Sequence, residues 1–234
     1  GATESRTISA AVNDFRLNPG TPTSFRITQQ PSNIVAGVSF SPEVELELLD
    51  AYANLVTNNN DFEIRPVFVK SDNSESVSDA VTASAGIIAF EDLTFTQSGT
   101  YRIRFEDTST SPLASVISSQ FVVTPANPNS LVWDVQPSDV VSRQLMAAPR
   151  LKVLDAFGNH VSTDALTTAR LRVINSASFA VTPSYATGLS KQASGGYITF
   201  DNLSLGLLAD TYSLEVLAST YSGVAIAGSL GGNS

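Results

Sequence analysis

The sequence of 234 residues contains no cysteine. This absence excludes disulfide bonds, thiolate metal sites and a cysteine nucleophile, although it leaves the cellular compartment open. Histidine occurs once, and a single imidazole without thiolate partners does not make a zinc site. The apolar runs fall well short of the roughly eighteen residues that a transmembrane helix needs. We therefore expect no cofactor and no membrane span in this segment.

Charged side chains are also scarce. They make up 15% of the residues and give a net charge of −9. Only 13 residues are Lys or Arg, and they are scattered along the chain. Nucleic acid binding needs clustered positive charge, so we expect no nucleic acid partner. Ser, Thr, Val and Ala are abundant instead, and this composition favours strands and turns over surface helices.

What the sequence does contain is an internal repeat. Residues 15–25 are echoed by residues 121–131, and each copy leads at the same spacing to Gln-Pro-Ser, at 30–32 and 136–138. In both copies an apolar strand pattern is followed by a Pro-x-x-Pro hinge and another strand pattern. A repeat of about a hundred residues has the size of one β-sandwich module. The chain is long enough for two such modules with separate cores.

The hinges set the predicted domain boundaries. Residues 1–19 are predicted to be the terminal strand of a preceding repeat, residues 20–125 the first module and residues 126–234 the second. Because the chain starts at Gly1-Ala2 without Met, we expect it to be a segment of a longer protein. Residues 3–18 are apolar enough to need cover, so we expect them either to pair with an exposed sheet edge, on this molecule or on a second copy, or to pack beside the first module. The last strand of the second module is predicted to be short.

The clearest strand pattern is Glu43–Leu48, in which glutamate alternates with Val or Leu. Since successive side chains of a strand point to opposite faces, the three apolar residues are predicted to face the core and the glutamates to face water. The segment Phe62–Phe68 indicates another strand. Pro66 within it indicates an edge or a bulge, because proline cannot donate to a strand ladder.

A turn sequence is also repeated, as Asp50-Ala51-Tyr52-Ala53-Asn54 and Asp155-Ala156-Phe157-Gly158-Asn159. Short Asp and Asn side chains hydrogen-bond nearby backbone amides, which favours such corners. Ala53 stands where the second copy has Gly158, and glycine tolerates a positive φ. The first turn is therefore expected to be strained or differently shaped.

Two further anchors recur in the same order. They are a Gly-x-Ile-x-Phe strand, at 86–90 and 196–200, and a Thr-Tyr pair that ends in Tyr101 or Tyr212. Together with Gln-Pro-Ser and the repeated turn, they resemble the tandem immunoglobulin-like repeats of large bacterial surface and secreted proteins, which are similar in layout to filamin-type modules. The resemblance implies an all-β fold of two tandem immunoglobulin-like antiparallel β-sandwiches, each with seven to nine strands. It also implies that the two tyrosines are structural tyrosine corners.

The candidates for catalysis are weak. His160, Ser162 and Asp155 lie close in sequence, but a triad needs three groups placed in line on a scaffold, and these crowd one turn. We therefore favour an exposed loop histidine. The acidic pair Glu91-Asp92 is replaced by Asp201-Asn202 in the second module, which favours a role at a corner over a general acid and base.

Calcium binding is a separate hypothesis, because hard cations take several oxygen ligands. The candidate ligands are Asp50, Asn54, Asp61, Glu106 and Asp107. Neither an EF-hand nor a dense Asp repeat is present, so ordinary turn chemistry is favoured.

Sugar binding would use exposed aromatic side chains. Trp133 aligns with Ile27 on an alternating strand, which favours a place in the core. Tyr185 and Tyr221 lie in less periodic stretches and are candidates for surface contacts.

We assign no residue of this chain to catalysis, a cofactor or a metal. Self-contained modules joined by a short hinge with two prolines favour a structural spacer or stalk. We therefore expect a non-catalytic segment of a modular extracellular or cell-surface protein. Its expected partners are neighbouring repeats of the same chain and, in an adhesin, a cell-surface or matrix ligand. Two alternatives stay open, namely an adhesive or carbohydrate-binding module and accessory domains of a secreted hydrolase.

Overall fold

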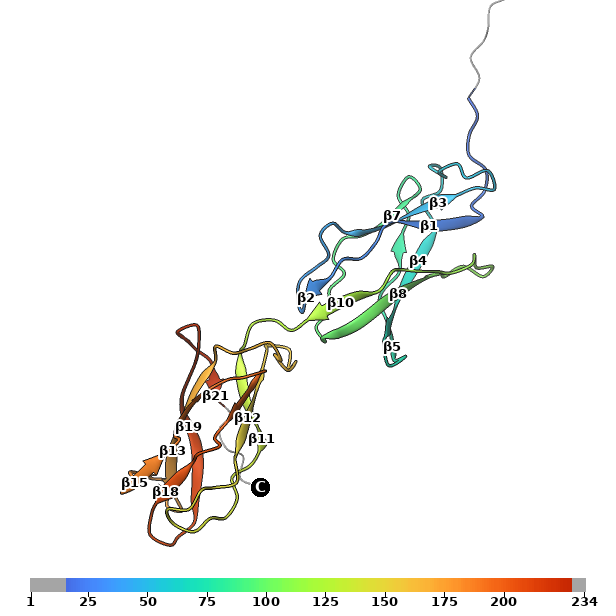
Figure 1. The fold of residues 1–234 in the computed structure, drawn as a ribbon. Helices are drawn as coiled ribbons and strands as arrows, with labels where there is room; N and C mark the ends of the chain where they lie inside the picture. The colour runs from blue at the N-terminus through green and yellow to red at the C-terminus, as the bar shows by residue number, and fades with distance from the viewer. Residues whose placement is uncertain (1–15, 229–234) are drawn as a thin grey trace, which may run out of the picture.

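The computed structural model describes residues 16–228. These residues form 21 strands and no helix, so none of the described residues belongs to a helix that could cross a membrane. Figure 1 shows two β-sandwiches placed end to end and joined by the segment between β10 and β11. The predicted all-β class with two tandem immunoglobulin-like sandwiches is confirmed.

The first sandwich packs a three-stranded sheet against a larger one. The smaller sheet has the order β1 (Ser24–Gln29), β3 (Val44–Leu49) and β7 (Ile87–Phe90). The larger has the order β2 (Ile34–Val35), β10 (Phe121–Thr124), β8 (Gly99–Asp107), β4 (Glu63–Lys70) and β5 (Glu75–Val77), with β6 (Val81–Thr82) beside β4 and β9 (Val116–Ile117) beside β8. The chain crosses between the two sheets several times, from β1 through β2 and β3 to β4 and from β6 through β7 to β8, as it does in immunoglobulin folds.

The second sandwich repeats this layout. One sheet has the order β17 (Tyr197–Thr199), β12 (Arg150–Leu154), β11 (Ser130–Val135) and β21 (Ala227–Gly228). The facing sheet has the order β14 (Ala180–Val181), β13 (Thr168–Asn175), β19 (Tyr212–Tyr221) and β20 (Val224–Ala225), with β16 (Ser190–Gln192) beside β13. A separate pair joins β15 (Tyr185–Thr187) to β18 (Ser204–Gly206).

Two details differ from the sequence expectation. The ten strands β1–β10 and the eleven strands β11–β21 exceed the seven to nine expected per module, because several are two-residue ladders at sheet edges. Two of these short ladders are parallel, since β2 pairs with β10 and β21 pairs with β11 in parallel. A parallel edge strand adds hydrogen bonds without changing the antiparallel centre of each sheet.

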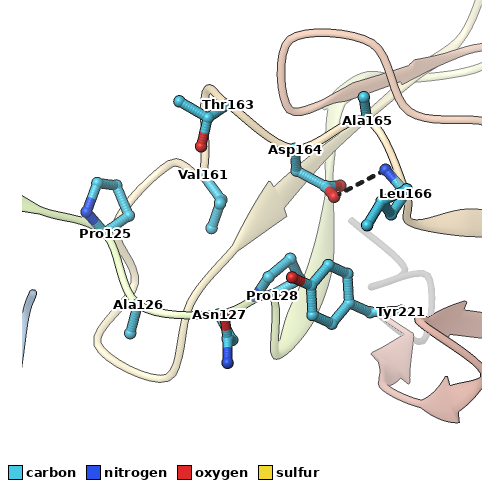
Figure 2. A pocket seen from close by; sticks show the side chains of 10 residues that line it. All are labelled: Pro125, Ala126, Asn127, Pro128, Val161, Thr163, Asp164, Ala165, Leu166 and Tyr221. Atoms are coloured by element: carbon cyan, nitrogen blue, oxygen red, sulfur yellow. Dashed lines mark hydrogen bonds between the residues drawn. The ribbon is translucent and has the colours of Figure 1, made fainter.

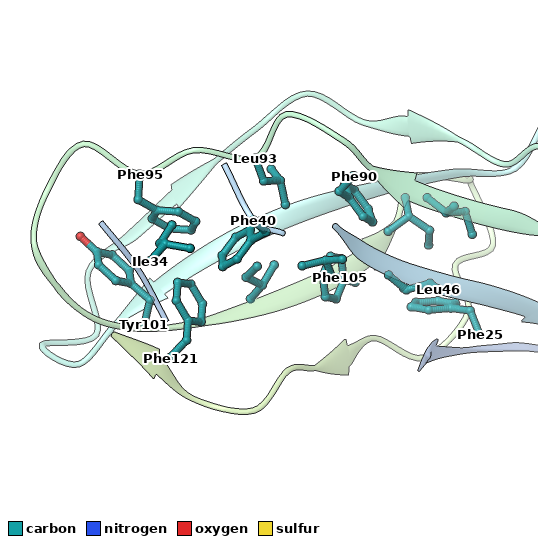
Figure 3. Close-up of a cluster of buried hydrophobic side chains, with 14 of the residues drawn as sticks. Phe25, Ile34, Phe40, Leu46, Phe90, Leu93, Phe95, Tyr101, Phe105 and Phe121 are labelled. Carbon is teal, nitrogen blue, oxygen red and sulfur yellow. The ribbon is translucent and has the colours of Figure 1, made fainter. Parts of the chain in front are cut away.

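The first core follows the alternation read from the sequence. Val44, Leu46 and Leu48 of β3 are fully buried, whereas Glu45 and Glu47 on the other face are half-buried. The strand begins at Val44 and not at Glu43. Figure 3 shows the aromatic part of this core, with six phenylalanines and Tyr101 labelled around Leu46, Ile34 and Leu93. The burial of β3 therefore confirms the predicted orientation of its two faces.

The second core is less aromatic. Its fully buried large side chains include Leu131, Leu151, Leu171, Ile198 and Phe200. Trp133 lies on β11 opposite Leu151 and packs against this core, while half-buried Ile27 takes the corresponding place opposite Leu46 in the first sandwich. The placement of Trp133 supports the core interpretation over an exposed sugar platform.

The tyrosine corners are present in both sandwiches. The hydroxyl of Tyr101 donates to the carbonyl of Gln97 at 3.0 Å, and that of Tyr212 donates to the carbonyl of Leu208 at 3.1 Å. Each hydroxyl thus ties the start of β8 or β19 to the backbone four residues upstream. This arrangement is structural, as the resemblance implied.

Pro66 lies in the middle of β4, where it pairs with Phe105 of β8. On the other side of β4, β6 pairs only with Glu63 and Ile64, and β5 pairs only from Val67 onward. Pro66 therefore stands at the break between two short partner strands, where no ladder bond needs its missing N–H. The predicted edge or bulge is thus a local gap in strand pairing on one side of β4.

The strand predicted for residues 3–18 falls mostly outside the described residues. Residues 16–18, which are described, lie in no strand, so this part of the prediction is wrong. The pairing expected for the rest concerns residues 1–15, which are also outside the described range. In the second sandwich the last described strand is β21, with two residues.

Candidate functional site

The most highly connected polar group at the junction of the two sandwiches is the carboxylate of Asp155. Its Oδ1 accepts hydrogen bonds from the N–H groups of Phe157 at 2.9 Å and Asn159 at 2.8 Å. Its Oδ2 accepts from Asn159 Nδ2 at 2.8 Å and from the N–H of Ala126, in the linker, at 2.9 Å. One buried carboxylate therefore fixes both the turn and the chain that enters the second sandwich.

These contacts also set the charge of Asp155. Burial alone would raise the pKa of its carboxyl group. The hydrogen bonds from Asn159, Ala126 and Phe157 stabilise the ionised form and together hold the pKa below its ordinary value. Asp155 is thus an ionised structural acceptor and has no free lone pair of the kind that a general base would use.

The turn reaches from the second sandwich to the end of the first. Asn159 Nδ2 donates to the carbonyl of Thr96 at 2.7 Å, and the N–H of Ser98 donates to Asn159 Oδ1 at 2.8 Å. Both polar atoms of one side-chain amide are therefore used across the junction. Because the acceptor and donor on the first sandwich are backbone atoms, their positions are fixed by its fold and not by rotamers.

An aromatic contact lies beside these hydrogen bonds. The ring of Phe157 packs on Gly37, so closely that a Cβ atom at residue 37 would be 2.4 Å from Phe157 Cζ. Gly37 has a φ of 82°, in the left-handed region, where glycine carries no penalty. The linker residue Ala126 packs against the first core at the same time as its N–H binds Asp155. The junction thus combines one ring, one amide pair and a tethered linker.

A small pocket lies beside the linker (Figure 2). It has a volume of about 210 Å³ and is bounded by Pro125–Pro128, by Val161–Leu166 without Ser162, and by Tyr221. The carboxylate of Asp164 accepts from the N–H groups of Leu166 at 3.0 Å and Thr167 at 3.2 Å, and so caps its own loop. Pockets for small ligands are usually about 300–1,000 Å³, so this one favours linker packing over ligand binding.

The residues suggested for a catalytic triad are not assembled. Asp155 is used by the turn, and His160 lies with its Nε2 3.3 Å from the carbonyl of Gly196 and its ring 4.5 Å from that of Tyr197. Ser162 is exposed, and no hydrogen bond links these three side chains in the part of the chain that is described. His160 is half-buried against Tyr197, so the expectation of an exposed loop histidine is wrong, because the ring gains aromatic contact there.

The acidic pairs also have local roles. Glu91 and Asp92 are exposed in a turn that follows β7. In the second sandwich Asp201 forms an ion pair with Lys191 at 2.6 Å. These positions agree with corners that follow a strand.

The five candidate calcium ligands are dispersed. Asp50 and Asn54 belong to one turn, and Glu106 pairs with Arg104 and Arg65 at 2.8 and 3.1 Å. Asp107 caps the loop after β8 by accepting from the N–H groups of Ser109 and Leu113, and Asp61 is exposed. Among residues 16–228, no three His, Cys, Asp or Glu side chains are grouped so that they could hold a metal ion.

The two candidate surface tyrosines differ in their exposure and surroundings. Tyr185 is about half-exposed on β15, while Tyr221 is half-buried beside the linker pocket. No aromatic stacking joins either of them to another ring in the described residues. The cluster of surface aromatics that would favour sugar binding is therefore not formed by these two.

The Asp155–Asn159 turn could be predicted from the sequence, but its contact with the first sandwich could not. The receiving side consists of backbone atoms of Thr96 and Ser98 and of the bare backbone of Gly37. Backbone atoms leave no mark in a sequence, and the glycine alone gave no reason to place a ring on it. The available signal was the repeated Asp-Ala-aromatic-x-Asn turn, in which an aromatic residue occupies an exposed corner.

Comparison of the sequence with models of known families gives no match, and neither does comparison with characterised proteins. Among solved structures, the FN1–FN3 domains of chicken CNTN1 are 12% identical, with 91% of this chain and 63% of that one covered and a TM-score of 0.27. A β-glycosidase from Bacteroides vulgatus is 8% identical, with 85% and 25% covered and a TM-score of 0.32. Three N-terminal domains of the outer capsid protein Hoc of bacteriophage RB49 are 13% identical, with 87% and 66% covered and a TM-score of 0.23.

The chain thus spans less than two thirds of the length of each of these structures, from 25% to 66%. With such low TM-scores, these similarities contribute nothing to a functional argument. The assignment of the fold rests on the strand order and the tyrosine corners described above.

Proposed function

We propose that this chain is a non-catalytic spacer, a stalk segment of a modular extracellular or cell-surface protein built from tandem immunoglobulin-like repeats. The observation that supports the proposal most is the docking of the Asp155–Asn159 turn on the end of the first sandwich. A flexible tether would need no such contact, whereas a spacer gains from it because the distance between its two ends is then defined.

The linker supports the same function. It has only a few residues between β10 and β11, two of which are prolines with restricted φ. Its N–H at Ala126 binds Asp155, and Pro128 is buried. Rotation of one sandwich against the other would therefore break the two bonds of Asn159 and the ring contact with Gly37 together.

Small-angle X-ray scattering of the whole chain tests this function. We expect an elongated particle whose scattering fits one end-to-end arrangement. The double variant Phe157→Ala/Asn159→Ala should require a range of inter-sandwich angles. The matched control is Tyr52→Ala/Asn54→Ala, which makes the same kind of change in the first turn and should leave the scattering unchanged. A wild-type chain that already needs a broad range of angles would contradict the proposal.

A further inference from the structure

We propose that the Asp50–Asn54 turn is a second docking surface, which binds the end of another immunoglobulin-like sandwich placed directly upstream in the same protein. The inference rests on the proposed function, because it extends one kind of junction to a further repeat. The partner is defined by its chemistry. It must present a glycine with positive φ where the first sandwich has Gly37, and a backbone carbonyl and N–H where it has Thr96 and Ser98.

The docking surface is already formed. Asp50 Oδ1 accepts from the N–H groups of Tyr52 and Asn54, both at 2.9 Å, and Oδ2 accepts from Asn54 Nδ2 at 3.1 Å. These are the bonds that Asp155 makes in the second turn. Ala53 has a φ of 62° and Gly158 a φ of 82°, so both turns have the same left-handed corner. Of the two alternatives expected for the first turn, the different shape is wrong and the strain is confirmed, because Ala53 takes the left-handed conformation of Gly158 although it is not a glycine.

Among residues 16–228, nothing covers the corresponding groups of the first turn across a junction. The side chain of Tyr52 is 88% exposed, compared with 44% for Phe157, whose ring lies on Gly37. The side chain of Asn54 is bonded to Asp50 as that of Asn159 is bonded to Asp155. Within residues 16–228, however, the Asn54 side-chain amide makes no hydrogen bond across a junction. A large aromatic side chain on a rigid corner is costly to leave in water and suits an interface.

The chain that enters the first sandwich also follows the path of the linker. The N–H of Gly20 donates to Asp50 Oδ2 at 2.8 Å, as the N–H of Ala126 donates to Asp155 Oδ2 at 2.9 Å. Three residues later, Thr23 N–H bonds to Leu49 O at 2.9 Å and Asn129 N–H bonds to Leu154 O at 2.8 Å. Residues 20–23 therefore run along the Asp50–Asn54 turn as residues 126–129 run along the Asp155–Asn159 turn. This shared path favours a partner in the same chain.

A second copy of this chain is a poorer partner. In its second sandwich, Arg143 takes the place of Gly37, since Arg143 N–H bonds to Leu205 O and Gly37 N–H bonds to Phe95 O, both at 2.8 Å. Arg143 also has a positive φ, of 68°. The Arg143 side chain would occupy the space that an aromatic ring needs at this position. On the copy's first sandwich, Gly37 is already covered by its own Phe157. The sandwich that fits therefore carries glycine and has a free end.

The test is a longer chain in which residues 20–125 are repeated, with Pro125 of the added repeat joined to Gly20 of the whole chain. Spin labels at residue 76 of both repeats report the new junction by double electron–electron resonance. A second labelled pair, at residues 76 and 190 of the original sandwiches, reports the existing junction in the same molecule. A broad distance distribution at the new junction with a narrow one at the existing junction would overturn only this inference. Broad distributions at both junctions would overturn the proposed function as well.

We expect a narrow distance distribution at the new junction. Tyr52→Ala/Asn54→Ala in the original repeat should remove the narrow peak, and so should Gly37→Arg in the added repeat, while Phe157→Ala should leave it in place. Arg143 shows that arginine is compatible with this backbone position. A broad distribution without substitutions, or one insensitive to both variants, would overturn the inference. Head-to-tail association of the original chain in sedimentation, abolished by Tyr52→Ala, would overturn the choice of partner.

Discussion

The ring of Phe157 in the second sandwich lies on the bare backbone of Gly37 in the first. A side chain at residue 37 would meet the ring at once, because a Cβ atom there would be 2.4 Å from Phe157 Cζ. The two residues are 120 positions apart in the chain, and each is placed for this contact by its own local turn. Gly37 has the left-handed conformation of a tight loop, and Phe157 projects from the corner fixed by Asp155.

This contact predicts that Gly37→Ala opens the junction, since the added methyl group displaces the ring. The positive φ adds strain of about 1 kcal/mol to the first sandwich. The side-chain amide signals of Asn159 in an NMR spectrum should move toward those of a solvent-exposed asparagine. Gly158→Ala is the control on the other side of the junction, because nothing lies within 4 Å of a Cβ there and Ala53 accepts the same conformation. Equal shifts of Asn159 in both variants would show that the ring contact does not hold the junction.

The two faces of β3 predict different mutational costs. Leu46→Ala leaves a cavity in a fully buried site and should lower the free energy of unfolding by about 2–5 kcal/mol. Glu45→Ala, on the outer face, should change it by less than about 0.5 kcal/mol. Chemical denaturation measures both. Comparable losses would mean that the strand faces are assigned the wrong way round.

Asp50 predicts a dependence of stability on acid. The hydrogen bond from Gly20 N–H, followed by that from the Asn54 side chain, lowers the pKa of Asp50 to about 2. Because its pKa in an unfolded chain is about 3.9, the carboxylate stabilises the fold fully above about pH 4. That stabilisation is lost as the pH falls toward 2 and the carboxyl group becomes protonated in the folded state.

The melting temperatures of the wild-type chain and the Asp50→Asn variant measure this effect. The wild type should melt higher at neutral pH, and the difference should shrink between about pH 4 and pH 2. A difference that is the same at pH 7 and at pH 2 would show that the charge of Asp50 does not hold the turn.

The tyrosine corner predicts a specific loss for one hydroxyl group. Tyr101→Phe removes the bond to Gln97 O, at 3.0 Å, and should cost about 0.5–1.5 kcal/mol of unfolding free energy. Tyr52→Phe removes a hydroxyl from a side chain that is 88% exposed and should cost nothing measurable. If both variants unfold at the same denaturant concentration as the wild type, Tyr101 is only a packing residue.

The fold could be predicted from the sequence because its signals are local. Alternation in Glu43–Leu48 determines which face of β3 is buried, and the repeated anchors give the tandem arrangement of strands. The parallel pairing of β2 with β10 could not be predicted, since two residues carry no periodicity. The half-burial of His160 depends on Tyr197, a residue of β17 that lies 37 positions later in the chain, and such a contact is likewise absent from a local pattern.

The candidate site was predictable only on one side. The turn at Asp155 has polar side chains whose spacing indicates a corner, and the repeat marks it twice. Its receiving surface consists of Gly37 and of backbone atoms at Thr96 and Ser98, and any sequence with the same fold could supply such atoms. The site is distinguished by the lack of a side chain at residue 37. The importance of this glycine can be recognised only once the position of the Phe157 ring is known.

The inference that the turn at Asp155 holds the two sandwiches in one arrangement can be tested by a distance measurement. The chain has no cysteine, so Ser76→Cys and Ser190→Cys place one spin label on each sandwich without competing thiols. Double electron–electron resonance should give a single narrow distance distribution, which Phe157→Ala/Asn159→Ala broadens and Tyr52→Ala/Asn54→Ala leaves unchanged. A broad distribution in the wild-type chain, or one that does not respond to the junction variant, would contradict the claim.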